Sequence, residues 1–205
     1  MSAMTTGYIG LGTMGGALAR RLLLSRPLHG FDLNPDSVAG LAAAGATAAP
    51  SAAALGALCD VVVLCLPKSA HVRAALFGEN GLAETLRPGS IIVDQTSGDP
   101  SETRRIAAEL AGRGIRMVDA PVSGGAAGAE AGTIAIMVGG AAADIDAIRP
   151  VLADISPNVF VCGEIGAGQV MKLINNMVSS TIRLVTLEGA ALGVKNGPDP
   201  AVLTA

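Results

Sequence analysis

The chain has 205 residues, of which 50% are hydrophobic, 15% are charged and only 2% are aromatic, and its net charge is −3. This composition excludes an intrinsically disordered chain and provides enough apolar side chains for a folded core. The sequence carries no basic run and too few aromatic residues for a base-stacking surface, so nucleic-acid binding is excluded as an expected function.

The three cysteines, Cys59, Cys65 and Cys162, do not have the spacing of a metal site. We therefore expect no bound metal, reduced thiols and a cytoplasmic protein. The sequence has no stretch that approaches eighteen consecutive apolar residues, so no membrane partner is expected.

From the N-terminus onward, short apolar stretches alternate with longer segments of helical periodicity. Residues 61–66 are an unbroken apolar run ended by Pro67, which is typical of a strand covered on both faces. The alternation predicts an α/β fold of the Rossmann type, with a doubly wound and mostly parallel sheet. Strands are predicted at 8–9, 28–31, 61–66, 90–93, 115–118, 133–138 and 159–162, and helices at 13–25, 34–45, 52–58, 69–77, 101–111 and 141–152.

A long helix is predicted at 167–194, and it ends where Asn196, Gly197 and Pro198 follow. Pro200 then begins a further helix. We expect residues 1–164 to form the α/β domain and residues 165–205 to form an interdomain helix and the start of an all-helical domain. A helix of this length needs other helices to bury its apolar stripe, so we expect the helical domain to be truncated in this chain.

A glycine motif, Gly10-x-Gly12-x-x-Gly15, lies between the first predicted strand and the first predicted helix. Gly10 permits a tight turn, Gly12 leaves the backbone open to a pyrophosphate, and Gly15 lets the helix pack closely on the sheet. The N-terminus of the helix presents free N–H groups to phosphates. Residues 1–164 are therefore predicted to bind a dinucleotide through a turn made of Gly10, Leu11, Gly12, Thr13, Met14 and Gly15.

Asp32 ends the second predicted strand and follows Gly12 at about the twenty-residue distance expected of an acid that binds a ribose diol. Its charge would repel the 2′-phosphate of NADP, and Leu33 and Asn34 offer no arginine that could compensate. We therefore expect NAD to be preferred over NADP as the cofactor.

Polar or turn-forming residues also follow two later strands. Leu66 and Pro67 end the strand at 61–66, and Thr96 and Ser97 follow the strand at 90–93. In an open α/β sheet, ligands lie outside the carboxyl ends of the strands, so these four residues are predicted to line the cofactor. The alternative is ordinary turn chemistry at strand ends.

Ser123, Gly124 and Gly125 lie between the strands predicted at 115–118 and 133–138. Their accessible N–H groups, together with the serine hydroxyl, can hold a carboxylate, so the loop is predicted to bind the substrate. The alternative is a tight turn without a ligand.

On the long helix, Gly168, Lys172 and Asn176 are spaced i, i+4 and i+8, and they are predicted to share one face. A lysine in a partly dry cleft has a lowered pKa, which suits a general acid–base. We predict that Lys172 is catalytic and that Asn176 holds a substrate oxygen. The alternative is a solvated lysine on an exposed face.

Four segments of the chain resemble, in the expected order, the signatures of the β-hydroxyacid dehydrogenases. That family includes 3-hydroxyisobutyrate dehydrogenase and tartronate semialdehyde reductase. The segments are residues 7–15, residues 119–125, residues 132–140 and the motif Gly166-x-Gly168-x-x-x-Lys172-x-x-Asn175-Asn176.

The resemblance implies an NAD(P)-dependent enzyme that moves a hydride between the cofactor and the β-hydroxyl, or the aldehyde, of a short hydroxy acid such as 3-hydroxyisobutyrate or tartronate semialdehyde. It also implies that Ser123, Gly124 and Gly125 bind the substrate carboxylate, that Lys172 is catalytic and that Asn176 contacts the substrate. Family members dimerise through their helical domain, so a homo-oligomer is expected for the full-length protein.

Two departures from the family pattern affect this reading. Family members usually carry Ser-Thr where this chain has Thr96-Ser97, so the sequence leaves open which of the two hydroxyls faces the nicotinamide. The decarboxylating phosphogluconate relatives carry a glutamate where this chain has Ser179-Ser180, which favours simple hydride transfer. A non-catalytic dinucleotide-binding module is the alternative function.

Overall fold

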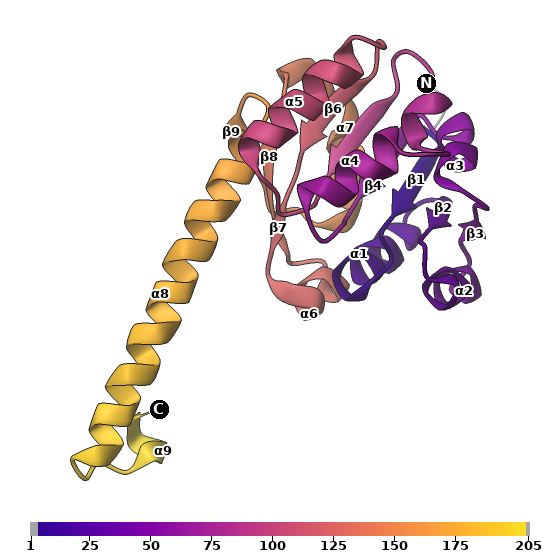
Figure 1. The fold of residues 1–205 in the computed structure, drawn as a ribbon. Coiled ribbons are helices and arrows are strands. Elements are labelled where there is room, and N and C mark those ends of the chain that lie inside the picture. The colour runs from indigo at the N-terminus through magenta and orange to yellow at the C-terminus, as the bar shows by residue number, and fades with distance from the viewer. Residues whose placement is uncertain (1–3, 204–205) are drawn as a thin grey trace.

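The computed structural model describes residues 4–203 and shows a sheet flanked by helices, from which one long helix projects (Figure 1). Within these residues the sheet has nine strands. They are β1 (Thr6–Ile9), β2 (Leu28–Phe31), β3 (Thr47–Ala48), β4 (Val61–Leu64), β5 (Ile91–Asp94), β6 (Arg116–Asp119), β7 (Val122–Ser123), β8 (Ala135–Gly139) and β9 (Val159–Gly163).

The strand order is β3-β2-β1-β4-β5-β6-β8-β7, and β9 pairs with β8. All pairs from β3 to β6 are parallel, whereas β8 runs antiparallel to β6 and β7 and parallel to β9. The prediction of a mostly parallel Rossmann-type sheet is therefore confirmed. From β1 the chain continues through β2 to β3 at one edge of the sheet. It then returns to β4, which lies on the other side of β1, and continues toward the other edge. The topological switch point is therefore between β1 and β4.

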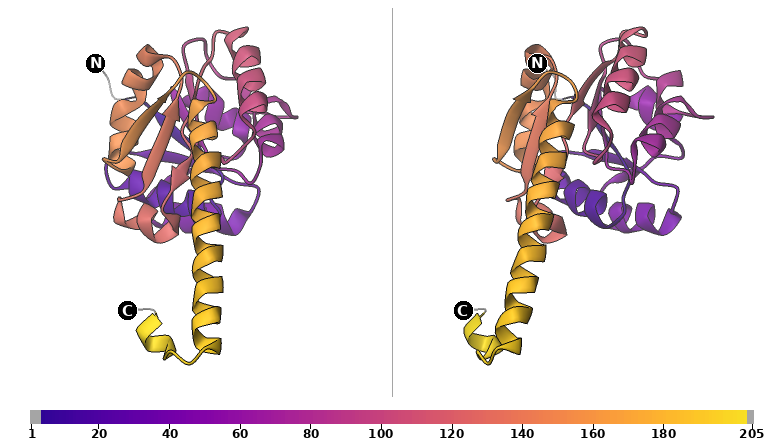
Figure 2. Two further views of the ribbon diagram at one scale, coloured as in Figure 1. Left: turned by 90° about the vertical axis from the view of Figure 1, so that its left-hand side faces the viewer. Right: turned by 60° about the vertical axis from the view of Figure 1, so that its left-hand side comes forward.

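Helices cover both faces of the sheet, as Figure 2 shows. The helices are α1 (Thr13–Leu23), α2 (Pro35–Ala43), α3 (Ala52–Leu58), α4 (Ser69–Phe77), the 3-10 helix η1 (Leu82–Glu84), α5 (Pro100–Ala111), α6 (Gly125–Ala131), α7 (Ala142–Ile155), α8 (Ala167–Lys195) and α9 (Pro200–Leu203). One core cluster joins the sheet to α1, α2, α6 and α7, and a second joins it to α3, α4, α5 and η1. Two fully covered faces explain why β4 is an unbroken apolar run.

Four short elements have no counterpart in the sequence analysis: β3, η1, β7 and α6. A strand of two residues is too short to show an alternating pattern, so β3 and β7 become visible only through their neighbours. The segment 125–131 contains four alanines, which favour a helix, and two glycines, which disfavour one, so propensity alone does not decide its structure. Its folding as α6 means that the serine–glycine loop runs directly into a helix that packs on α1.

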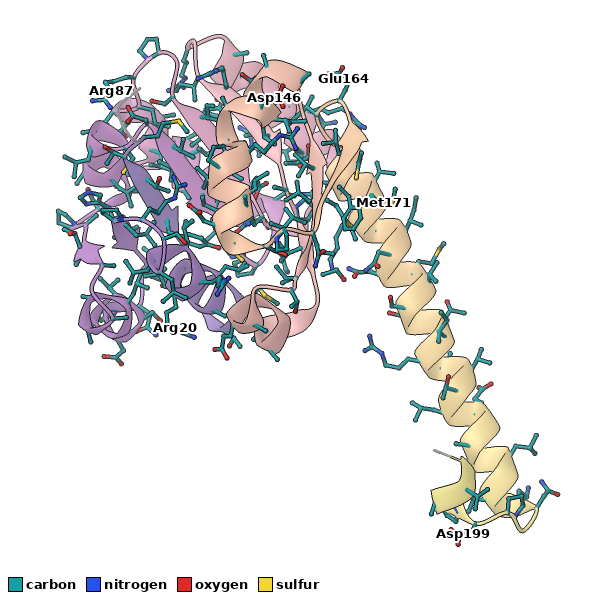
Figure 3. The ribbon with its side chains drawn as sticks, turned by 180° about the vertical axis from the view of Figure 1, so that it is seen from behind. Arg20, Arg87, Asp146, Glu164, Met171 and Asp199 are labelled. Carbon is teal, nitrogen blue, oxygen red and sulfur yellow. The ribbon has the colours of Figure 1, made fainter. Side chains whose placement is uncertain are left out.

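Helix α8 begins on the α/β body and then leaves it. Its first turns pack against β8 and β9, and Figure 3 shows Met171 near the point where the helix departs and Asp199 near its far end. The later turns expose apolar side chains; Ile182, Leu184 and Leu187 are each about 60% exposed or more. Among the described residues, α8 is the helix long and apolar enough to cross a membrane, judged by length and composition alone.

Candidate active site

The glycine turn after β1 is shaped by close contacts between backbone atoms. A Cβ on Gly10, whose φ is +92°, would overlap the Cys65 carbonyl oxygen, and a Cβ on Gly15 would overlap the Gly10 carbonyl oxygen. In contrast, a Cβ on Gly12 would meet no atom within 4 Å. Gly10 and Gly15 are therefore required by the packing, whereas Gly12 leaves open space in front of the backbone.

The N-terminus of α1 adjoins this open space. Gly12 is its N-cap residue and provides no side-chain cap, so the first amides of the helix keep their hydrogen-bonding capacity. The sequence has no acidic residue in the first turn of α1 to compete for the positive end of the helix dipole. Free amides, a favourable dipole and an uncovered backbone together suit a phosphate group.

Asp32 is held against the glycine turn. Its Oδ2 accepts a hydrogen bond from the Leu11 amide at 2.6 Å, and its Oδ1 accepts one from the Asn34 amide at 2.8 Å. The side chain of Leu11 points into the core, so this residue contributes its backbone to the turn. The two bonds orient the carboxylate beside the turn, where it can also accept hydrogen bonds from a diol.

A cleft of about 780 Å³ opens at the switch point between β1 and β4. It is bounded by the glycine turn, by the end of β2, by the loop after β4 and by one side of α4. Leu11, Thr96 and Ser97 are outside the lining. Of the predicted cofactor residues, the structure brings these to the cleft: Gly10, Gly12, Thr13, Met14, Gly15, Asp32, Leu66 and Pro67.

The two hydroxyls after β5 have different surroundings. Thr96 is buried, and its Oγ1 accepts a hydrogen bond from the Leu66 amide at 3.0 Å. Ser97 is exposed. Thr96 therefore ties its loop to the cleft wall at Leu66, while the Ser97 hydroxyl is the one accessible to a ligand.

A buried carboxylate fixes the first turn of α8 on the sheet. Asp119, at the end of β6, accepts hydrogen bonds from the amides of Gly166 at 2.6 Å and Gln169 at 2.7 Å. Burial raises the pKa of Asp119, and these backbone hydrogen bonds oppose the rise. The helix can approach β8 this closely because Gly168 has no Cβ. A Cβ at this position would overlap the carbonyl oxygen of Met137 in β8.

Lys172 lies one turn after this anchor and is only 9% exposed. Desolvation by burial lowers the pKa of its ammonium from the ordinary 10.5. Desolvation is the one cause of this shift, and no neighbouring carboxylate among the described residues opposes it. The amine is therefore placed in a drier environment than a surface lysine, as the sequence analysis expected.

The serine–glycine loop meets α8 at Asn175, whose Nδ2 donates a hydrogen bond to Ser123 Oγ at 2.9 Å. Gly124 and Gly125 both have positive φ values, 143° and 71°, which turn the chain from β7 into α6. Because the serine oxygen accepts from the amide, its own proton stays available for a ligand oxygen. The loop and the lysine-bearing helix are thus joined by a side-chain contact.

Of the predicted face of Gly168, Lys172 and Asn176, the first two residues are buried, whereas Asn176 is exposed and the adjacent Asn175 is half-buried. At 3.6 residues per turn, Asn176 is rotated by about 40° from Lys172, and Asn175 by about 60° in the opposite direction. The role of Asn176 as a substrate ligand stays a prediction.

Two residues that the sequence analysis did not single out connect the site. Asn175 is the first, and Gln169 is the second: its Nε2 donates to the Thr96 carbonyl oxygen at 2.6 Å, and its Oε1 accepts from the Gly98 amide at 2.9 Å. Each lies three residues from Lys172 along α8, Gln169 before it and Asn175 after it, so the two residues flank the lysine at about 60° of helix rotation to either side. That spacing is the signal that could have identified them.

The chain was compared with known proteins. Residues 5–163 match the family described as the NAD binding domain of 6-phosphogluconate dehydrogenase. Two similar proteins from Pseudomonas aeruginosa are a 3-hydroxyisobutyrate dehydrogenase, 41% identical over 96% of the chain, and an NAD-dependent L-serine dehydrogenase, 43% identical over 96%. The chain spans 66% of each of these relatives, just under two thirds of their length.

A solved structure shows the same similarity. The 3-hydroxyisobutyrate dehydrogenase of Mycobacterium tuberculosis, described with L-serine, has a TM-score of 0.88 and is 35% identical; the match covers 95% of this chain and 66% of that one. The likeness extends beyond the α/β domain, because a match over 95% of the chain must include most of α8.

Proposed function

This chain belongs to the β-hydroxyacid dehydrogenase family, and from that membership we propose that it transfers a hydride between NAD and the β-hydroxyl of a short hydroxy acid. The observation that carries the proposal is the position of Lys172. This lysine is buried on a helix that is hydrogen-bonded on one side to the Ser123 loop and on the other to the loop after β5. An acid–base group thus lies between two predicted ligand-binding loops.

The residues at the switch point fit a dinucleotide. Gly12 leaves room for a pyrophosphate at the start of α1, and the carboxylate of Asp32 borders the same cleft, where it can bind a ribose diol. Since a carboxylate repels a 2′-phosphate, we propose NAD as the preferred cofactor over NADP. When bound, the nicotinamide ring accepts the hydride in oxidation and supplies it in reduction.

The substrate would be held by its carboxylate. Ser123 can donate its hydroxyl proton, and the amides around Gly124 and Gly125 are available as further donors. The names of the two Pseudomonas relatives support a common substrate shape: 3-hydroxyisobutyrate and L-serine each carry a hydroxymethyl group on the carbon next to a carboxylate. We propose the same shape for this protein's substrate.

Lys172 would act as the general acid–base. In oxidation its neutral amine accepts the proton of the β-hydroxyl as the carbon loses its hydride, and in reduction the ammonium returns that proton. Burial favours the neutral amine, because desolvation penalises the charged form. Asn176 would hold a substrate oxygen one turn away, on the exposed part of the same helix.

A non-catalytic module that binds the dinucleotide without turnover is the second candidate. The cleft contains most of the predicted cofactor residues, but Ser123 and Lys172 lie outside its lining, so binding is supported separately from chemistry. A homo-oligomeric, cytoplasmic protein remains part of the proposal.

The test compares two lysines of α8. We expect Lys172→Ala to lower the rate of hydroxy-acid oxidation by roughly 10²–10⁴, the usual contribution of a general acid–base. Lys195→Ala, at the exposed end of the same helix, serves as the control and should keep the wild-type rate. NADH fluorescence verifies that both variants still bind cofactor.

The pH profile gives a second measurement. Because burial lowers the lysine pKa, the oxidation rate should rise with pH and level off below the ordinary value of 10.5. If Lys172→Ala keeps more than about a tenth of the rate, this lysine is not the acid–base. NADH binding without turnover of any hydroxy acid would favour the non-catalytic module.

A further inference from the structure

Gln169 is fully buried, and both polar atoms of its side-chain amide make a hydrogen bond. Its side-chain Nε2 donates to the Thr96 carbonyl oxygen, its Oε1 accepts from the Gly98 amide, and its backbone N–H donates to Asp119. A buried primary amide with both functions satisfied holds two backbone groups at a set distance and orientation. Gln169 therefore joins the segment 96–98 to the first turn of α8.

The segment 96–98 is connected in turn to the wall of the cleft. Thr96 Oγ1 accepts a hydrogen bond from the Leu66 amide, and Leu66 lines the cleft at the switch point. A continuous path of hydrogen bonds thus leads from the cleft wall through Thr96 to Gln169. Lys172 lies three residues further along the same helix, so the path ends one turn from the proposed acid–base.

We propose that Gln169 is a positioning residue that fixes the cofactor-side loop 96–98 relative to Lys172. The inference rests on the proposed function for its catalytic consequence, while the coupling between loop and helix stands on the hydrogen bonds alone. Only a side chain with one donor and one acceptor at the end of a flexible stem can satisfy Thr96 and Gly98 together. In oxidation the hydride and the proton leave the same substrate group. The nicotinamide ring, which would accept the hydride, and Lys172, which would accept the proton, therefore need a constant separation.

The loop has a second, independent attachment, which makes the proposal testable. Ser69, at the start of α4, accepts a hydrogen bond from the Asp99 amide through its Oγ at 2.9 Å. The loop after β5 therefore stays attached to the body of the molecule when Gln169 is changed. Loss of the glutamine should loosen the register between loop and helix without unfolding either of them.

The experiment uses two substitutions and a control in the full chain. Gln169→Met keeps the approximate volume and removes both side-chain hydrogen bonds. Gln169→Glu keeps an acceptor for Gly98 and loses the donor to Thr96 unless its carboxyl is protonated. Thr186→Ala is the control, because it lies on the exposed part of α8 and loses only a bond to the Ile182 carbonyl.

The first measurement is amide exchange without cofactor. In Gln169→Met the Gly98 amide should exchange about tenfold faster than in the wild type, the size expected for one buried hydrogen bond. The Gln169→Glu variant should keep most of the protection, because its acceptor remains. Unchanged Gly98 exchange in Gln169→Met would overturn the proposal.

The second measurement is the affinity for NADH between pH 8 and pH 6. Gln169→Met should raise Kd about three- to tenfold at both pH values. Gln169→Glu should bind weakly at pH 8 and recover toward pH 6, as its buried carboxyl gains the proton that Thr96 needs. Every variant keeps Asp94, which is bonded to the Thr96 amide, Asp119, which is bonded to the Gln169 amide, Arg104, which acts on Asp119, and Lys172, so each Kd is compared with the wild type at the same pH. An equal loss at both pH values in Gln169→Glu would contradict a donor role.

The third measurement is turnover. Gln169→Met should lower kcat about tenfold or more while the KM for the hydroxy acid changes little, because Ser123 is held separately by Asn175. If the wild type binds NADH but oxidises no hydroxy acid, the proposed function fails, while Gly98 exchange and NADH affinity still decide the role of Gln169. If the wild type is active and Gln169→Met matches it in kcat and NADH affinity, the role of Gln169 fails while the proposed function stands.

Discussion

The two ends of the candidate site are built by different forces. At the glycine turn the backbone is packed so tightly that Gly10 and Gly15 have no room for a methyl group. At the start of α8 the geometry depends on buried polar groups, chiefly Asp119, Gln169 and Asn175, each of which makes hydrogen bonds to another element.

This difference has consequences for what each end tolerates. Steric packing is insensitive to pH and is disturbed by added volume. Buried hydrogen bonds tolerate a change of volume poorly as well, but they are also sensitive to the protonation state and the polarity of each partner. The cofactor end should therefore respond to methyl groups, and the acid–base end should respond to charge and pH.

The largest effect is expected from adding a methyl group at the glycine turn. Gly15→Ala should destabilise the fold by about 3 kcal/mol, because the new Cβ overlaps the Gly10 carbonyl oxygen. Gly12→Ala is the matched variant: its Cβ meets no atom within 4 Å, so the melting temperature should stay within about 2 °C of the wild type.

The same pair separates folding from binding. Gly12→Ala should weaken NADH binding at least about tenfold, since its methyl group occupies the space expected for the pyrophosphate. Thermal unfolding and NADH titration of both variants provide the measurements. A stable Gly12→Ala chain with wild-type affinity would place the pyrophosphate elsewhere.

A smaller effect, dependent on pH, is expected at Asp94, whose Oδ1 accepts a hydrogen bond from the Thr96 amide. Burial raises the pKa of Asp94 from 3.8 to about 7. Between these values the unfolded chain releases a proton that the folded chain keeps, so this group's contribution to stability is full below pH 3.8 and is lost as the pH rises to about 7.

Asp94→Asn removes this titration and keeps an oxygen for the Thr96 amide. Its stability relative to the wild type should therefore increase by roughly 2 kcal/mol from pH 5 to pH 8, part of the full shift being offset by relaxation. Urea unfolding at both pH values measures the difference. The charge of the neighbouring Asp119 also raises the pKa of Asp94, so the measured difference includes this interaction. A difference that is constant with pH would show that Asp94 is ionised in the folded chain.

A change of about tenfold in the KM for the hydroxy acid is expected at Asn175. Asn175→Ala should raise the KM for the hydroxy acid about tenfold, because Ser123 loses the donor that orients its hydroxyl. Asn175→Asp should be worse, since a carboxylate would accept the serine proton and repel the substrate carboxylate. NADH affinity should not change in either variant; a loss of NADH affinity equal to the rise in KM would indicate general disruption of α8.

The smallest effect is expected on the distal turns of α8, which belong to neither end of the site. Leu184→Gln and Leu187→Gln should change the stability of this chain by no more than about 0.5 kcal/mol, because both side chains are already exposed. Chemical denaturation measures this. A loss above 1 kcal/mol would indicate that these residues are packed in solution, for example against a second copy of the chain.

Much of the fold could be predicted from local sequence. The apolar run before Pro67 and the glycine motif before α1 identify their elements because each signal lies within a few residues. The short elements β3 and β7 were not predictable in this way, since their pairing partners are distant in the chain.

The sequence by itself determined the order of the longer strands and helices, the glycine turn and the presence of a lysine-bearing helix, because propensity and periodicity act over a single element. Only the tertiary structure decided that Asn175 rather than Asn176 faces Ser123, that Thr96 is buried while Ser97 is exposed, and that Gln169 joins two loops. The physical reason is the rotation of α8 about its axis, which is set by where Asp119 anchors the first turn and not by any pattern within the helix.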